Sequence, residues 1–198
     1  MDSQMVVGID VGGQTTKLGV VDARGTVLAQ TVIRTDTYSD IEPYIAELAE
    51  ALNKIIKESA TEGLIKGIGV GAPNGNYYTG TIENAVNLSW GGTKTIQFTK
   101  LLSEAMNGLP VALTNDANAA AVGEMTYGAA RGMKNFIMIT LGTGVGSGIV
   151  INGEVVYGHD GFAGELGHVA AVRNNGRVCN CGKTGCLETY ASATGVAR

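Results

Sequence analysis

The stretch GIDVGGQTTK, residues 8–17, holds the pattern that decides the fold of this chain. A short apolar run precedes two adjacent glycines, and an alternating apolar run begins just after them. The pattern predicts strands at 6–11 and 15–22, joined by a tight hairpin whose backbone N–H groups can bind a phosphate. A third strand at 27–35 would complete an antiparallel meander. An ordinary glycine hairpin without a ligand is the alternative at this point.

The stretch TLGTGVGSG, residues 140–148, repeats this organisation further along the chain. Glycines that alternate within a sheet indicate that something approaches the backbone closely. The strands predicted around this turn cover residues 135–140, 147–151 and 154–157. Two such units predict two similar α/β domains, 1–117 and 118–198, with a nucleotide held between them.

The remaining elements are predicted from the spacing of apolar residues. Helices are expected at 41–56, 95–106, 117–127 and 187–196, and buried strands at 65–71 and 111–114. The first helix would begin with a capping box, SDIE at 39–42. The segment PNGN at 73–76 is predicted to be a loop.

Composition and charge exclude several classes of protein. The chain has 198 residues with 14 basic and 18 acidic side chains, a net charge of −4, and no run of basic residues. We therefore expect no nucleic-acid or membrane partner. The sequence contains neither a signal-like start nor an apolar run of the ~20 residues that span a bilayer. These features predict a cytoplasmic protein.

An aspartate stands at the predicted junction of a strand and a helix, in LTNDAN at 113–118. An acidic side chain in this place suits a general base. Asn and Asp are also common helix caps, and from the local sequence alone the cap is the stronger interpretation.

The three cysteines lie close together and follow a histidine. Cys179, Cys181 and Cys186, with His168 upstream, make a Cys3His set suited to a closed, structural zinc site. An odd number of cysteines that lie close together in the sequence argues against a disulfide framework. The alternative is three buried thiols and an unrelated histidine. The other histidine, His159, is expected at the surface.

Taken together, these motifs resemble the ROK (repressor, open reading frame, kinase) family of sugar kinases, most closely its glucokinases. The resemblance runs from residue 6 to the end of the chain. Its most specific part is GH at 167–168 followed by CNCGKTGCLE at 179–188. DVGG at 10–13, NLSW at 87–90 and NDANAA at 115–120 support it.

The resemblance implies an α/β protein with the actin-like, RNase H-like ATPase fold, two similar domains around a cleft. Family members continue beyond this length, so we expect the second domain to be incomplete. The implied activity is the ATP-dependent phosphorylation of a hexose, preferably glucose, at its 6-hydroxyl. The implied cofactors are ATP, Mg²⁺ and a structural Zn²⁺, and the expected assembly is a homo-oligomer, a dimer or tetramer.

The resemblance also implies roles for individual residues. Asp116 would be the catalytic base, and His168, Cys179, Cys181 and Cys186 would bind zinc. The sugar would be bound by Asn87, Asn115, Asp116, Glu165, His168 and Glu188. ATP and magnesium would be bound by Asp10, Gly12, Gly13, Gln14, Thr15, Thr16, Lys17, Gly142, Thr143 and Gly144.

Two departures from the family pattern and three alternatives qualify this interpretation. Gln14 stands where the family usually has threonine, and Asn74 where it usually has glycine. The substrate could instead be N-acetylglucosamine or N-acetylmannosamine, or the chain could bind sugar without turnover. A sugar-sensing regulator of the family would place a helix-turn-helix before the first strand, and a strand beginning at residue 6 leaves no room for one.

Overall fold

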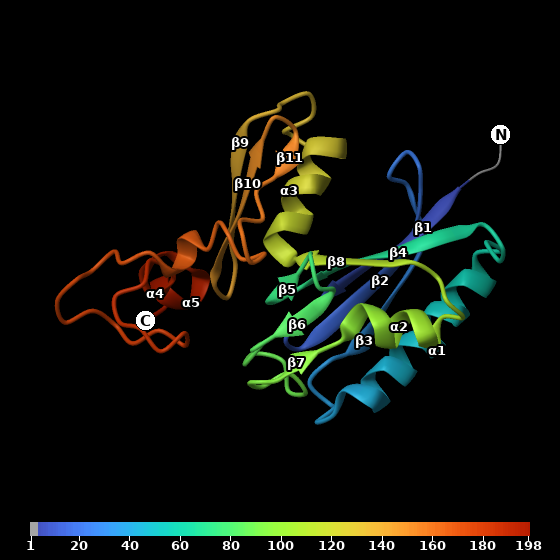
Figure 1. The fold of residues 1–198 in the computed structure, drawn as a ribbon, viewed down its shortest axis with the longest axis horizontal. Helices are drawn as coiled ribbons and strands as arrows, with labels where there is room; N and C mark the ends of the chain where they lie inside the picture. Colours follow the sequence, from blue (N-terminus) through green and yellow to red (C-terminus); the bar gives the residue numbers. More distant parts are fainter. Residues whose placement is uncertain (1–3) are drawn as a thin grey trace. The chain divides into compact units, whose positions relative to one another are not determined.

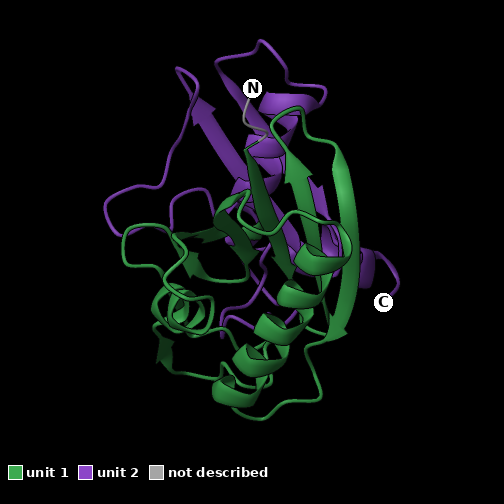
Figure 2. Cartoon of the chain, turned by 90° about the vertical axis from the view of Figure 1, so that its right-hand side faces the viewer, with its two compact units in different colours: residues 1–116 green, residues 117–198 purple. Residues whose placement is uncertain are grey.

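The computed structural model describes residues 4–198 and divides into two compact units, residues 1–116 and 117–198 (Figure 2). Each unit contains an antiparallel three-stranded meander with a glycine turn between its first two strands (Figure 1). Both predicted meanders are therefore present. In the part of the chain from residue 4 onward, no helix combines the length and the apolar character that crossing a membrane requires.

Unit 1 is built on a five-stranded sheet with the order β3-β2-β1-β4-β8. Its strands are β1 (Met5–Val11), β2 (Thr15–Asp22), β3 (Val27–Arg34), β4 (Ile65–Ala72) and β8 (Val111–Asn115). The first three strands are antiparallel, while β4 and β8 run parallel to β1. Parallel neighbours need crossover connections, which the two helices of this unit provide.

Helices α1 (Ile41–Glu58) and α2 (Phe98–Ala105) contact each other and cover the core of unit 1 (Figure 1). The predicted capping box of α1 is wrong. The helix begins one residue later than the box requires, with Asp40 as N-cap and no side-chain cap bond. Pro43 then occupies the third helical position, where the box needs a backbone N–H that proline lacks.

Three short strands of unit 1 form a second sheet that the sequence analysis did not predict. They are β5 (Gly75–Asn76), β6 (Thr81–Glu83) and β7 (Thr95–Ile96). The loop predicted at 73–76 and the helix predicted from 95 are wrong at these residues, because strands of two residues show no periodicity. Asn74 precedes β5 at a φ of 54°, and its Nδ2 donates to the Glu83 carbonyl at 2.9 Å. Asparagine is one of the few residues other than glycine that adopt this left-handed conformation readily.

Unit 2 contains the second meander and one helix against it. Helix α3 (Asp116–Tyr127), whose first residue is the last of unit 1, precedes β9 (Phe136–Leu141), β10 (Val145–Ile151) and β11 (Glu154–Val155), which form a sheet in the order β11-β10-β9. Glycines in β10 let α3 approach closely, since a Cβ at Gly148 would lie 2.8 Å from that of Ala121. The alternating glycines therefore have a packing role beyond the turn itself.

The helix predicted at 187–196 is wrong as a single element. The structure has a turn of 3-10 helix, η1 (Leu166–His168), and then two short helices, α4 (Glu188–Ala191) and α5 (Ala193–Val196). Ser192 separates α4 from α5 with a ψ of 164°, and its hydroxyl accepts from the Gly195 N–H at 3.0 Å. Serine competes with helix continuation in this way, because its side chain caps a new helix.

Candidate functional site

The first glycine turn is a narrow hairpin that lies against Asn87. The Gly12 N–H donates to the Thr15 carbonyl at 3.0 Å, which closes the turn around Gly13 and Gln14. A Cβ at Gly13 would lie only 2.9 Å from the Asn87 carbonyl oxygen. The structure thus brings two predicted phosphate residues next to a predicted sugar residue, and glycine is needed there for close approach.

Thr16, a predicted phosphate residue, points into the core instead. Its side chain is fully buried, and its hydroxyl lies 2.8 Å from that of Thr35 and 2.7 Å from that of Tyr44. Burial raises the pKa of Tyr44 to about 12, and the bond to Thr16 opposes this shift only in part. Thr16 anchors the hairpin, so we omit it from the proposed phosphate contacts.

Asp10 and Lys17 are cross-strand partners at the end of β1 and the start of β2. Directly opposed residues of an antiparallel pair project from the same face of the sheet. Both side chains are exposed. A carboxylate for a metal ion and a cation for a phosphate are therefore presented together, beside the glycine turn.

The second glycine turn, at residues 142–144, is held by the segment that follows the cysteines. The Gly142 N–H donates to the Gly144 carbonyl at 3.0 Å, and the Val145 N–H donates to Glu188 Oε2 at 3.3 Å. A Cβ at Gly144 would lie 2.5 Å from the same carboxylate oxygen. Glu188, predicted as a sugar ligand, lies directly against this turn.

Asp116 is the first residue of α3, immediately after the last residue of β8. Its side chain is exposed and that of Asn115 is partly buried. The carboxylate therefore lies at the junction of β8 and α3, as the sequence predicts.

Glu165 and His168 lie on a segment that is fixed to β10. The Ser147 hydroxyl donates to the Gly164 carbonyl and accepts from the Leu166 N–H at 3.2 Å. Gly167 packs against the Val145 carbonyl so closely that no side chain fits there. These contacts position the Glu165 and His168 backbone beside the strand that follows the second turn.

His168, Cys179, Cys181 and Cys186 form a cluster in which one ligand atom of each lies within 4.8 Å of the others. The Cys181 and Cys186 sulfurs are 3.6 Å apart, as are the Cys179 sulfur and His168 Nδ1. Ligands held about 2.3 Å from a tetrahedral zinc ion lie about 3.8 Å from each other. The donor set and its spacing therefore fit zinc with Nδ1 as the histidine ligand, although the structure contains no ion.

The thiols of the cluster differ in their acidity. Burial raises the pKa of Cys179 to about 12 and also raises that of Cys186. Burial acts in the same sense on Cys181, but a bond from the Lys183 backbone and bonds with the other two thiols lower its pKa overall. Lys183 also donates from Nζ to the His168 carbonyl at 3.3 Å, which ties the two sides of the cluster together.

Comparison with known proteins identifies the family. A profile of the ROK family matches residues 6–198, nearly the whole chain. The chain belongs to the ROK family. The predicted fold class is confirmed, because its structural neighbours are ROK sugar kinases with the actin-like ATPase fold.

Individual relatives of this ROK chain include kinases and regulators. It is 44% identical to a glucokinase from Halalkalibacterium halodurans, over 100% of this chain and 59% of the relative. A ROK family glucokinase from Streptomyces griseus, in complex with glucose and AMPPNP, has a TM-score of 0.80 and 33% identity over 98% of this chain and 59% of that one. A ROK family transcriptional regulator, a homolog of the E. coli MLC protein, has a TM-score of 0.83 and 27% identity over 98% of this chain and 48% of that one. The chain thus spans about three fifths of the length of the curated glucokinases it matches.

Within each unit, the structure of this ROK chain gathers a distinct part of the predicted site. Unit 1 brings together Asn87 and the first turn, whereas unit 2 brings together the metal cluster, Glu188 and the second turn. Sequence analysis missed Arg177 and Thr194, which hold the α4–α5 segment and the second turn. A single arginine beside a cysteine motif gave no signal, and Thr194 lay inside a predicted helix.

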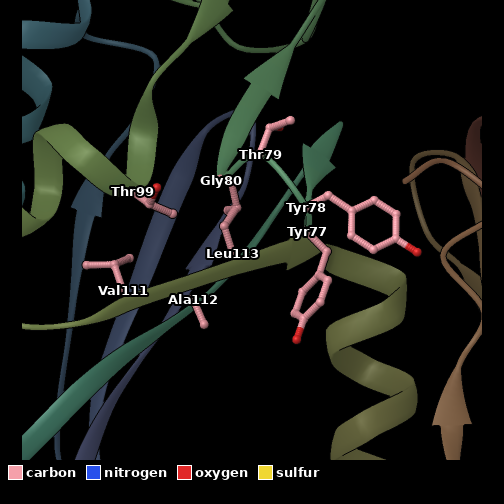
Figure 3. A pocket seen from close by; sticks show the side chains of 8 residues that line it. All are labelled: Tyr77, Tyr78, Thr79, Gly80, Thr99, Val111, Ala112 and Leu113. Carbon is pink, nitrogen blue, oxygen red and sulfur yellow. The ribbon is translucent and has the colours of Figure 1, made fainter. Parts of the chain in front are cut away.

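A cavity of about 450 Å³ lies beside β8, and none of the predicted site residues lines it (Figure 3). It is lined by Tyr77, Tyr78, Thr79, Gly80, Thr99, Val111, Ala112 and Leu113. The two tyrosine rings meet edge to face at 5.9 Å and are 50% and 58% exposed. Its lining side chains are uncharged and include none of the predicted site residues, so we assign the cavity no part in the site.

Proposed function

We propose that this ROK protein transfers the γ-phosphoryl group of ATP to the 6-hydroxyl of a hexose, with glucose as the preferred substrate. The observation that carries the proposal is the exposed Asp116 carboxylate at the start of α3. The whole of this chain is 44% identical to part of a glucokinase. The glucose and AMPPNP complex of the Streptomyces griseus enzyme supports the choice of both substrates.

In this proposal Asp116 accepts the proton of the sugar 6-hydroxyl. The sugar oxygen forms a bond to the γ-phosphorus as the bond from that phosphorus to the ADP oxygen breaks, and the proton moves to the carboxylate. Such a transfer depends mainly on positioning and on neutralising the phosphate charge. Asn87, Asn115, Glu165, His168 and Glu188 would hold the sugar hydroxyls.

The two glycine turns would supply backbone N–H groups to the phosphates. Gly12, Gly13, Gln14 and Thr15 would line the first contact and Gly142, Thr143 and Gly144 the second. The N–H groups of Gly12 and Gly142 close the turns themselves, so the donors come from the residues that follow them. Lys17 adds a positive charge. Asp10 would hold Mg²⁺, which neutralises phosphate charge when bound. Zinc on His168, Cys179, Cys181 and Cys186 would order the segment that carries Glu165 and Glu188. Nδ1 of His168 lies toward the cluster, which leaves Nε2 for the sugar.

A sugar-responsive regulator is the second candidate, favoured by the TM-score of 0.83 with a ROK transcriptional regulator. It would bind the same sugar without transferring phosphate. N-acetylglucosamine and N-acetylmannosamine remain the alternative substrates. We further propose a cytoplasmic homo-oligomer, in keeping with three cysteines that form no disulfide.

The test is sugar-dependent ADP formation from ATP with each of the three sugars, on this chain and on the longest product that its gene encodes. We expect turnover with glucose and a loss of 10²–10⁴-fold in kcat for Asp116→Asn, since the variant lacks a general base. Sugar affinity of this variant should change little, because an amide still accepts a hydrogen bond.

Asp36→Asn is the matched control. Asp36 is a surface carboxylate of the same unit that pairs with Arg34 at 2.7 Å, and its loss should leave kcat unchanged. If the wild-type chain and the longest product of its gene both bind sugar but form no ADP, the regulator is favoured. Equal kcat for Asp116→Asn and the wild type would overturn the assignment of the base.

A further inference from the structure

The α4–α5 segment holds the second glycine turn from behind. The Ala193 N–H donates to the Gly142 carbonyl at 2.9 Å, and the Thr194 hydroxyl donates to the Thr143 carbonyl at 2.7 Å. Both carbonyls of the turn are therefore directed toward α5. Neither bond belongs to the sheet, and the Thr194 bond joins residues 51 apart in sequence, so the turn depends on a distant segment.

These two bonds fix the direction of the N–H groups of the turn. In a trans peptide the C=O and the N–H of the same unit point in opposite directions. Since the Gly142 and Thr143 carbonyls face α5, the N–H groups of Thr143 and Gly144 face away from it. Two successive N–H groups with a common direction can bind one anionic oxygen.

The α4–α5 segment is in turn held by the loop that carries the metal ligands. Arg177, two residues before Cys179, donates from Nη1 to the Thr189 carbonyl at 2.8 Å and to the Gly195 carbonyl at 2.7 Å. Its guanidinium also lies 4.8 Å from the centre of the Tyr190 ring. One side chain thus bridges α4 and α5 across the break at Ser192.

We propose that Thr194 is a positioning residue for the phosphate turn, and that Arg177 and α5 connect this turn to the zinc loop. The proposal rests on the phosphoryl-transfer function for its ligand. Thr194 does not touch the phosphate in this scheme. It acts by holding the Thr143 carbonyl, so that the following N–H is ready for the ligand before binding.

The test compares Thr194→Val with Thr194→Ser and Thr126→Val. Thr126 is the matched control, because its hydroxyl also donates to a backbone carbonyl, that of Val122, at 2.7 Å on the same unit. Hydrogen exchange of the amides at 142–145 and the affinity for ATP with Mg²⁺ are measured for each variant. We expect Thr194→Val to speed exchange at the turn and to weaken ATP binding on the order of fivefold, the effect of one lost hydrogen bond.

Thr194→Ser keeps the donor and should restore both values, while zinc content stays the same in all three variants. Unchanged exchange at 142–145 in Thr194→Val would overturn the inference. Faster exchange there in a protein that does not bind ATP would support the positioning role and reject the phosphate ligand. The two proposals can therefore fail separately.

Discussion

The two glycine turns of this protein have the same local pattern but are anchored in different ways. The first is held from inside a hydrophobic core: the Thr35 N–H donates to the Gln14 carbonyl at 2.9 Å, and the buried Thr16 hydroxyl contacts those of Thr35 and Tyr44. The second is held by Glu188, Ala193 and Thr194, which follow the metal ligands. A similar hairpin can thus depend on the core in one unit and on the segment after the cysteines in the other.

The cores of the two units explain this difference. Every buried residue of the main hydrophobic cluster belongs to unit 1, including Tyr44, Trp90 and Phe98. Among the described residues of unit 2, the buried apolar side chains are only alanines, valines and cysteines. On β9, Ile137, Ile139 and Leu141 are 57%, 45% and 66% exposed. A structural metal is one source of stability that a unit with a small hydrophobic core can use.

Removing the metal should have the largest effect and should affect only the second turn. Structural zinc sites contribute on the order of 10 kcal/mol to the folding of small domains. We expect zinc-free Cys181→Ser to lose protection from hydrogen exchange over 177–196 and over 142–145, and to lose sugar binding. The first turn, at 12–15, should keep its protection.

Asn180→Ala is the control for this variant, since Asn180 is an exposed neighbour of two ligands but is not one of them. Its zinc content and exchange should match the wild type. Normal protection at 142–145 in a sample verified to be free of zinc would show that the second turn does not depend on the metal loop.

Removing the Tyr44 hydroxyl should affect the first turn and leave the second unchanged. Its effect should be smaller than that of removing the metal. Tyr44→Phe leaves the buried Thr16 hydroxyl with one partner fewer, at a cost of about 1–2 kcal/mol. We expect faster exchange at 12–15, unchanged exchange at 142–145 and a lower midpoint of thermal unfolding. The pKa of Tyr44 is about 12 in the folded protein and 10 in the unfolded chain. The stability that Tyr44 contributes is therefore lost as pH rises from 10 to 12. The stability of Tyr44→Phe should not show this pH dependence.

Tyr38→Phe is the matched control, because Tyr38 meets the Tyr44 ring edge to face at 6.0 Å and is only partly buried. Its unfolding should keep the full pH dependence between 10 and 12. If Tyr44→Phe kept that dependence as well, the buried hydroxyl would not be the group that titrates.

The sequence predicts these elements where a short-range pattern determines them. Both meanders follow from alternating apolar residues beside glycines, and the metal cluster follows from the spacing of Cys179, Cys181 and Cys186. The direction of the Thr16 hydroxyl could not be predicted, because its partner Tyr44 is 28 residues away. The break at Ser192 was missed since a serine cap inside an apolar helical pattern gives only a weak signal. A long-range contact decided the first case and a local side-chain cap the second.

The last comparison distinguishes the two turns by steric space alone, and its Gly142→Ala variant has the smallest expected effect. A methyl group at Gly13 would meet the Asn87 carbonyl at 2.9 Å, whereas a methyl group at Gly142 would meet nothing within 4 Å. Neither glycine has the positive φ that would strain an alanine. We expect Gly13→Ala to cost about 1–2 kcal/mol and to weaken the binding of ATP with Mg²⁺. Gly142→Ala should be neutral or stabilise by about 0.4–1 kcal/mol, since it reduces the freedom of the unfolded chain.

The two alanine variants control for each other, because each adds the same methyl group to a predicted phosphate turn. Thermal unfolding and ATP titration of both should therefore give effects of opposite sign or very different size. Equal losses of affinity would mean that bound phosphate fills the space beside Gly142 as closely as Asn87 fills that beside Gly13. In that case Gly142→Ala would still unfold at the wild-type temperature without ATP, and only the ligand would detect the added methyl group.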